Sequence, residues 1–134
     1  MYQGEWKDDK ADGFGHYFHQ DGTVYRGFWK QDTQHGRGVE KWPDGSKFEG
    51  NYSEGVKEGF GKFTWCDNNV YEGNFKDNNI EGKGTYIWSD GRKYNGMWKN
   101  NKMHGYGILE WPDGKCYDGH YFEDKKHGYG TFYW

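Results

Sequence analysis

The residues of this 134-residue chain that could do chemistry recur at fixed intervals. A Gly-x-Gly pair, the usual start of a phosphate-binding loop, first occurs at Gly13 and Gly15. None of its copies extends to G-x-G-x-x-G, and none precedes a predicted helix whose backbone N–H groups could hold a phosphate. We therefore expect no nucleotide or other cofactor site, and we assign these glycines to the packing of rings.

Metal and catalytic sites are not indicated by the other polar residues. His35, His104 and His127 each stand one residue before such a glycine, so neighbouring ones would lie two strands, about 10 Å, apart. Ligands of one zinc ion each lie about 2 Å from the metal, so these histidines cannot share an ion. The carboxylates of Asp8 and Asp9 are predicted on an exposed loop, and no Ser–His–Asp or Cys–His arrangement is suggested. We expect no metal, no catalytic residue and no enzyme activity.

The elements that carry these residues repeat with a period of 23. Each unit begins with an aromatic residue at position 1: Tyr2, Tyr25, Phe48, Tyr71, Tyr94 and Tyr117. Glycine follows at positions 3, 12 and 14, and a second aromatic residue stands at position 5. Position 18 is His19 in the first unit and tryptophan in the others: Trp42, Trp65, Trp88, Trp111 and Trp134. A fixed period of this length indicates a repeat array, which usually presents an elongated binding surface.

Alternation within the unit predicts β-hairpins. Positions 1, 3 and 5 of one strand, and 12, 14, 16 and 18 of the next, place rings between glycines on one face and leave the other face mostly polar. Glu40 is the exception at position 16, which is otherwise apolar. We predict an all-β fold: an elongated single-layer antiparallel meander of six hairpins, with a continuous row of packed rings. The array covers residues 1–134, and its last unit is partial.

Two kinds of turn are expected. The polar stretch at positions 7–11, which is Asp8–Asp12 in the first unit, predicts a five-residue loop within each hairpin. Trp-Pro-Asp-Gly, at Trp42 and Trp111, predicts a tight turn between units, since proline presets φ and glycine completes the turn. Asn68 replaces that glycine in the third unit and tolerates positive φ.

The repeat resembles the MORN family (membrane occupation and recognition nexus repeats) over essentially the whole chain. The resemblance is carried by segments such as residues 94–98 (Tyr-Asn-Gly-Met-Trp), 104–107 (His-Gly-Tyr-Gly) and 111–114 (Trp-Pro-Asp-Gly). It implies cytoskeletal, ciliary or membrane-junction partners. Such repeats also accompany lipid-kinase domains, although this chain has no kinase residues, so it could be the accessory repeat region of such a protein.

Composition narrows the possible partners. The net charge of −3 gives no overall attraction to nucleic acid or anionic lipid. No apolar run approaches the roughly 18 residues of a membrane span, and Met1 and Tyr2 already belong to the first repeat, so no signal peptide is expected. Two cysteines are too few for a secreted disulfide scaffold. We expect a cytoplasmic protein, with possible attachment to a membrane, the cytoskeleton or a cilium.

The leading functional hypothesis is a scaffold that grips an extended or helical segment of a protein partner on its aromatic face. Large rings on a curved sheet suit such a role. The candidate contacts are Trp29, Tyr52, Trp65, Phe75, Trp88, Trp98 and Trp111.

An alternative is binding of anionic phospholipid, including phosphoinositides. Four basic residues of the second unit fall on the polar face by strand alternation: Arg26, Lys30, Arg37 and Lys41. Anionic headgroups favour such a cluster by about 1 kcal/mol per basic residue near the surface. Glu49 and Glu72 interrupt the stripe.

A third hypothesis is self-association. The last strand of the predicted meander reads Gly-Tyr-Gly-Thr-Phe-Tyr-Trp and carries no charge, so its edge could pair with another molecule. The candidate residues for a homodimer are Tyr129, Thr131 and Tyr133.

Overall fold

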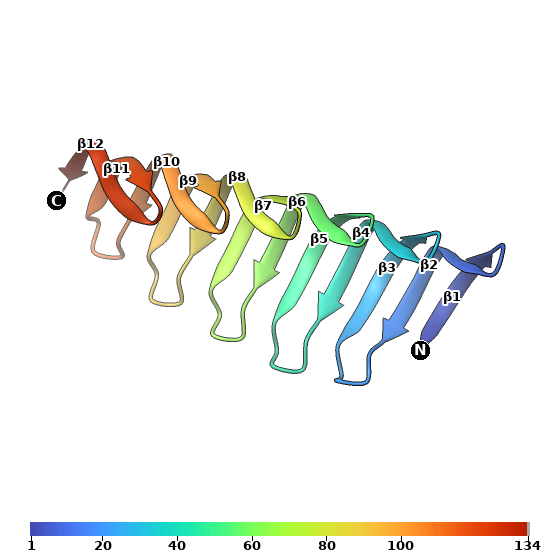
Figure 1. Ribbon diagram of the computed structural model, residues 1–134. Helices are drawn as coiled ribbons and strands as arrows, with labels where there is room; N and C mark the ends of the chain where they lie inside the picture. The colour runs from blue at the N-terminus through green and yellow to red at the C-terminus, as the bar shows by residue number, and fades with distance from the viewer. Residues whose placement is uncertain (134) are drawn as a thin grey trace.

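The computed structural model describes residues 1–133 and consists of one open sheet of twelve strands, in chain order, each antiparallel to its neighbours (Figure 1). The strands are β1 (Tyr2–Lys7), β2 (Lys10–Phe18), β3 (Val24–Lys30), β4 (Thr33–Lys41), β5 (Lys47–Ser53), β6 (Val56–Thr64), β7 (Val70–Lys76), β8 (Asn79–Ile87), β9 (Lys93–Lys99), β10 (Lys102–Glu110), β11 (Cys116–Phe122) and β12 (Lys125–Tyr133). The predicted meander of six hairpins is confirmed. Trp134, at position 18 of the last unit, lies outside the described residues.

The turn within each hairpin differs from the prediction. It has two residues, not five, and the strand resumes at Lys10 in the first repeat. Asp8 and Asp9 have φ of 51° and 65°, and the equivalent pairs in the other repeats also have positive φ, as in type I′ hairpin turns. Asp and Asn tolerate this conformation, so the polar stretch is mostly strand. Gly55, with φ of 86°, occupies the second turn position of the third repeat.

The turn between repeats agrees with the prediction. In the second repeat the N–H of Gly45 donates to the carbonyl of Trp42 at 3.1 Å, and Trp42 N–H donates to Ser46 at 3.0 Å. Asn68 has φ of 72° and donates to the carbonyl of Trp65 at 2.9 Å, so it does replace the turn glycine.

Each hairpin contains a bulge that bends it. In the first repeat Gly4 pairs with Gly15, but Trp6 pairs with Ala11. The single residue Glu5 therefore lies opposite three residues, 12–14. The same shift occurs in all six hairpins. Bulges increase twist and redirect a strand. Figure 1 shows each hairpin folding over near the turn between its two strands, which we call the inner turn.

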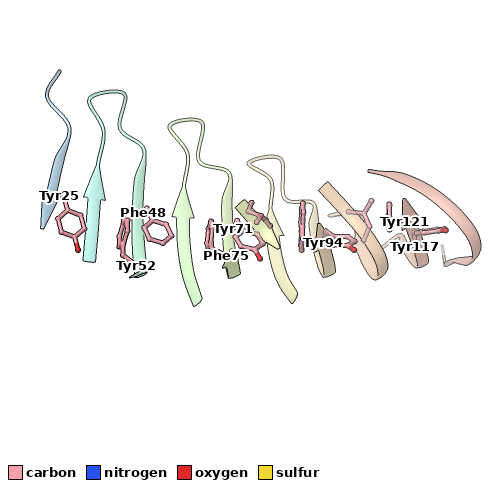
Figure 2. Close-up of a cluster of buried hydrophobic side chains, with 11 residues drawn as sticks. Tyr25, Phe48, Tyr52, Tyr71, Phe75, Tyr94, Tyr117 and Tyr121 are labelled. Carbon is pink, nitrogen blue, oxygen red and sulfur yellow. The ribbon is translucent and has the colours of Figure 1, made fainter. Parts of the chain in front are cut away.

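The core is a file of rings that runs along the sheet (Figure 2). Each position-1 ring lies over two glycines: a Cβ on Gly84 would come within 2.1 Å of the Tyr71 hydroxyl, and one on Gly73 within 2.6 Å. Successive rings meet edge to face, with centroids 4.9–5.6 Å apart. We call this the ring file; its order is Trp6, Tyr2, Trp29, Tyr25, Tyr52, Phe48, Phe75, Tyr71, Trp98, Tyr94, Tyr121 and Tyr117. The predicted continuous row of packed rings is therefore present.

Neighbouring repeats are also joined at their inner turns. Asp32 N–H donates to the carbonyl of Ala11 at 2.9 Å, and the Asp32 side chain accepts from Ala11 N–H at 2.6 Å. The same two-way contact, which we call the turn clasp, is made by Asn78, Asn101 and Asp124. Gly55 makes only the backbone half, to Gln34 at 2.9 Å.

A candidate protein-binding face and a basic groove

Three of the predicted partner contacts are buried. Tyr52, Phe75 and Trp98 expose only 4–6% of their surface, because they fill the ring file between two position-1 rings. They therefore stabilise the sheet and offer a partner no surface, which corrects the prediction for these residues. Trp29 is half-buried, and its indole N–H already donates to the carbonyl of Gly15 at 3.3 Å.

The rings at positions 16 and 18 form a second, more exposed row beside the file. Along this row the distances between neighbouring ring centroids are 5.3 Å for Trp42–Phe63, 4.6 Å for Phe63–Trp65, 5.3 Å for Trp65–Tyr86 and 4.7 Å for Tyr86–Trp88. All five are half-buried. We call them the tryptophan row. Trp65 and Trp88 were predicted partner contacts, whereas Trp42, Phe63 and Tyr86 were not named.

The tryptophan row also carries indole N–H groups that have no hydrogen-bond partner within residues 1–133. Trp98, in the ring file, donates its indole N–H to the carbonyl of Gly84 at 3.3 Å. Within residues 1–133, the indole N–H groups of Trp42, Trp65 and Trp88 make no hydrogen bond. Each of these rings thus combines an apolar surface with a hydrogen-bond donor.

The row is bounded at both ends. At one end Glu40 replaces a ring and accepts a hydrogen bond from the Tyr52 hydroxyl at 2.6 Å. The ammonium of Lys57 lies 5.5 Å from the Trp42 ring, and burial lowers the pKa of Lys57 while Glu40 opposes that shift. At the other end Leu109 stands at position 16, and the predicted contact Trp111 stacks instead on Phe132 at 6.2 Å.

Lys57 was missed by the sequence analysis. It stands at position 10, which the five-residue loop prediction removed from the strand. The repeat pattern could have identified it, because position 10 is even, like positions 12, 14, 16 and 18, and so lies on the face that carries the rings. Ala11 and Ile80, at the same position in other repeats, are buried there.

The opposite face carries a basic groove over β2–β5. A hollow of ≈ 560 Å³ is lined by Arg26, Arg37, Lys41 and Lys47 together with apolar side chains: Phe14, Val24, Phe28 and Val39. Three of the four predicted basic residues thus come together, while Lys30 lines a separate hollow with Glu54. Lys47 was not foreseen. Glu49 lies 3.5 Å from both Arg37 and Lys47, so one carboxylate partly offsets four cations.

The residues predicted for self-association lie on β12, which is exposed along its length. Tyr129 is 93% and Tyr133 54% exposed, and Thr131 is also exposed. Within the described residues β12 pairs only with β11. The structure thus leaves this edge accessible, and homodimer formation stays a prediction.

Other kinds of site find no support in the described part of the chain. Residues 1–133 contain no group of three or more His, Cys, Asp or Glu placed to hold a metal ion. They also contain no helix long and apolar enough to cross a membrane.

Comparison with known proteins places the repeat. No curated protein matches the chain. Among solved structures it is similar to the TCP domain of SAS-4 (dCPAP) of Drosophila melanogaster, solved in complex with a proline rich motif of Ana2 (dSTIL). Identity is 18% and the TM-score 0.50, over 78% of this chain and 58% of that one, so the likeness is one of fold. The MORN repeat family model matches residues 2–24, 25–47, 48–70, 71–91, 94–116 and 117–134. The chain therefore belongs to the MORN repeat family.

Proposed function

We propose that the chain is a non-enzymatic scaffold that binds a segment of a protein partner on the tryptophan row. The observation that carries the proposal is a set of three half-exposed tryptophans at one register on successive hairpins. Tryptophan is enriched among the residues that dominate binding energy, since it combines a large apolar surface with a donor. The row packs against the ring file on one side, through Phe63 on Phe48 and Tyr86 on Trp98, and its rings remain half-exposed on the other.

Two further points support a protein partner. The family is one of repeat arrays, whose stacked units present extended surfaces. The TCP domain of SAS-4, which shares the fold, was solved with a protein motif bound. We propose a cytoplasmic location, with the partner belonging to the cytoskeleton, a cilium or a membrane-associated complex.

The test is quantitative capture with matched variants. A tagged chain would be used to isolate partners, and each identified protein would be titrated against the purified chain. Trp65→Ala with Trp88→Ala should weaken binding at least about tenfold, the loss typical of one hot-spot residue. The control changes Lys62→Glu and Lys83→Glu on the opposite face and should leave affinity unchanged. Equal binding by both variants would refute the proposal.

A second candidate function rests on the basic groove: binding of anionic phospholipid. Arg26, Arg37, Lys41 and Lys47 line one hollow whose other side chains are apolar, which suits a headgroup with an adjoining acyl region. The equivalent hollow in the fourth repeat contains Glu72 and Asn74 where the second repeat has Arg26 and Phe28. The second repeat is thus specialised within an otherwise regular array.

Vesicle co-sedimentation tests this candidate. Vesicles of phosphatidylcholine with phosphoinositide should bind the chain at low salt and release it as salt rises, because exposed charges are screened. Arg26→Glu with Lys41→Glu should abolish binding. Lys62→Glu with Lys83→Glu, on the same face outside the groove, is the control and should retain most of it. Absence of binding at low salt would rule the candidate out.

A further inference from the structure

We propose that the segment seated on the tryptophan row is a polyproline-II strand that crosses the hairpins, with a proline at every third residue. The inference rests on the proposed function and specifies its partner. Successive tryptophans of the row are two strands apart, which is about 9.6 Å at 4.8 Å per strand. A polyproline-II helix repeats every three residues, or about 9.3 Å. The two periods therefore differ by only about 0.3 Å per repeat.

Other backbone conformations do not match this spacing. An α-helix rises 1.5 Å per residue, so the residue that returns to the same face, i+7, lies about 10.5 Å along the axis and falls out of step by about 0.9 Å per repeat. A β-strand advances about 3.3 Å per residue, so the third residue arrives at the right distance but points to the opposite face. Of the three, the threefold polyproline-II helix presents an equivalent side chain to each tryptophan with the smallest mismatch.

Hydrogen bonding agrees with the same occupant. A polyproline-II strand makes no internal hydrogen bonds, so its carbonyl groups remain free to accept. Within residues 1–133, the indole N–H groups of Trp42, Trp65 and Trp88 are donors of the row without a hydrogen-bond partner. The strands along the row, β4 to β8, are each paired on both sides, so the segment cannot add to the sheet as a further strand there.

Charge along the inter-repeat turns gives the segment a direction. Asp90 pairs with Arg92 at 2.8 Å and Asp113 with Lys115 at 3.2 Å. Asp44 and Asp67, at the same turn position beside Trp42 and Trp65, form no ion pair within residues 1–133. The row is therefore bordered at its β4–β6 end by two carboxylates without an ion pair, beside Lys57 and Glu40, whose opposite charges offset each other, and at its β8 end by a neutral pair. The segment should carry an Arg or Lys at the end that lies over Asp44 and Asp67.

Labelled synthetic peptides test the inference by fluorescence anisotropy on the 134-residue chain. The first peptide has proline at every third residue and one terminal Arg. The second has the same composition with proline at every fourth residue, and the third is an amphipathic helix with leucines at i, i+3 and i+7. We expect the first to bind at least tenfold more tightly than the other two. Equal affinity for the two proline spacings, or tighter binding of the helix, would overturn the inference.

Variants of the row separate this inference from the proposed function. Trp65→Phe keeps a ring and removes the donor, so it should weaken the first peptide. Asp44→Asn with Asp67→Asn should cost about two- to fivefold, the size of exposed ion pairs, and the control Asp113→Asn nothing. If the variant with Asp44→Asn and Asp67→Asn binds the first peptide as tightly as the unchanged chain, the predicted direction of the segment is wrong. If a captured protein needs the row but no proline peptide binds, the inference fails alone; if neither the captured proteins nor the peptides depend on the row, both fail.

Discussion

The position-1 tyrosine of the first, second, fourth and fifth repeats links backbone, glycine and ring packing. Its ring covers two glycines, and its hydroxyl donates to the carbonyl three residues on: Tyr25 to Phe28 at 3.0 Å, Tyr71 to Asn74 at 2.9 Å, and Tyr94 to Met97 at 3.0 Å. These acceptors lie in the bulge, where strand pairing is shifted. The hydroxyl thus satisfies a backbone group that the bulge takes out of register.

Removing one such hydroxyl should measurably destabilise the sheet. Tyr71→Phe keeps the ring, which fits because Phe48 already occupies this position in the third repeat. We expect a loss of about 1 kcal/mol in the free energy of unfolding, the net worth of a typical hydrogen bond, by urea denaturation. Tyr121→Phe is the control: its buried hydroxyl has no partner within residues 1–133, so stability should be unchanged or slightly higher. Equal losses for both variants would contradict this role.

The same tyrosines make stability fall at high pH. Burial raises the pKa of Tyr94 to about 12, and raises the pKa of Tyr25 and Tyr71 as well. Their unfolded pKa is about 10, so folding favours the neutral form and its contribution is complete below that pH. The free energy of unfolding should then decrease as pH rises from about 10 through about 12. Urea midpoints measured across this range would show it; a flat profile would mean that these hydroxyls ionise freely in the fold.

At the scale of elements, inner turns and turn clasps set the spacing of the hairpins. Gly55 is the one second-turn residue without a side chain to complete its clasp, since the others are Asp or Asn. Gly55→Asn should add an acceptor for the N–H of Gln34 and suit the positive φ. We expect stabilisation of about 0.5–1.5 kcal/mol by urea denaturation. Asn78→Gly, the reverse change in the next repeat, should cost a similar amount; if it costs nothing, the clasp does not stabilise the array.

The exposed edge of β12 also belongs to this scale. β12 begins with Lys125 and Lys126, which oppose pairing at that end, but the stretch 128–133 carries no charge, and an edge with unpaired backbone groups favours strand addition there. If copies of this chain associate there, Thr131→Lys should convert them to monomers, and light scattering would report the change in mass. A Lys at Thr85, on an interior strand, is the control and should not change it. An unchanged mass for Thr131→Lys would refute association through this edge.

Across the whole molecule, the period made the architecture predictable. Rings and glycines at fixed positions determined the hairpins, the face they share and the turn that Asn68 completes. The inner turn could not be predicted from the polar pattern alone, because Asp8 and Asp9 read equally as a loop or as residues with positive φ. That error assigned position 10 to a loop, so Lys57 was not recognised as a residue of the ring-bearing face.

The candidate site was only partly predictable for a related reason. Alternation places Tyr52 and Trp65 on one face, but it does not say that edge-to-face packing buries the first and leaves the second half-exposed. The basic groove was closer to the prediction, since Arg26, Arg37 and Lys41 share a face by parity. In the structure Lys47, from the adjacent strand, also lines the groove, whereas Lys30 lines a separate hollow.

We propose that the two faces of the sheet are independent binding surfaces, with a protein partner on the tryptophan row. The most direct measurement is hydroxyl-radical footprinting of the chain, alone and in complex with a captured partner, read by mass spectrometry. We expect oxidation of Trp65 and Trp88 to fall in the complex, while Phe28, in the basic groove, stays as reactive as before. Unchanged oxidation of both tryptophans, with protection confined to Phe28, would contradict it.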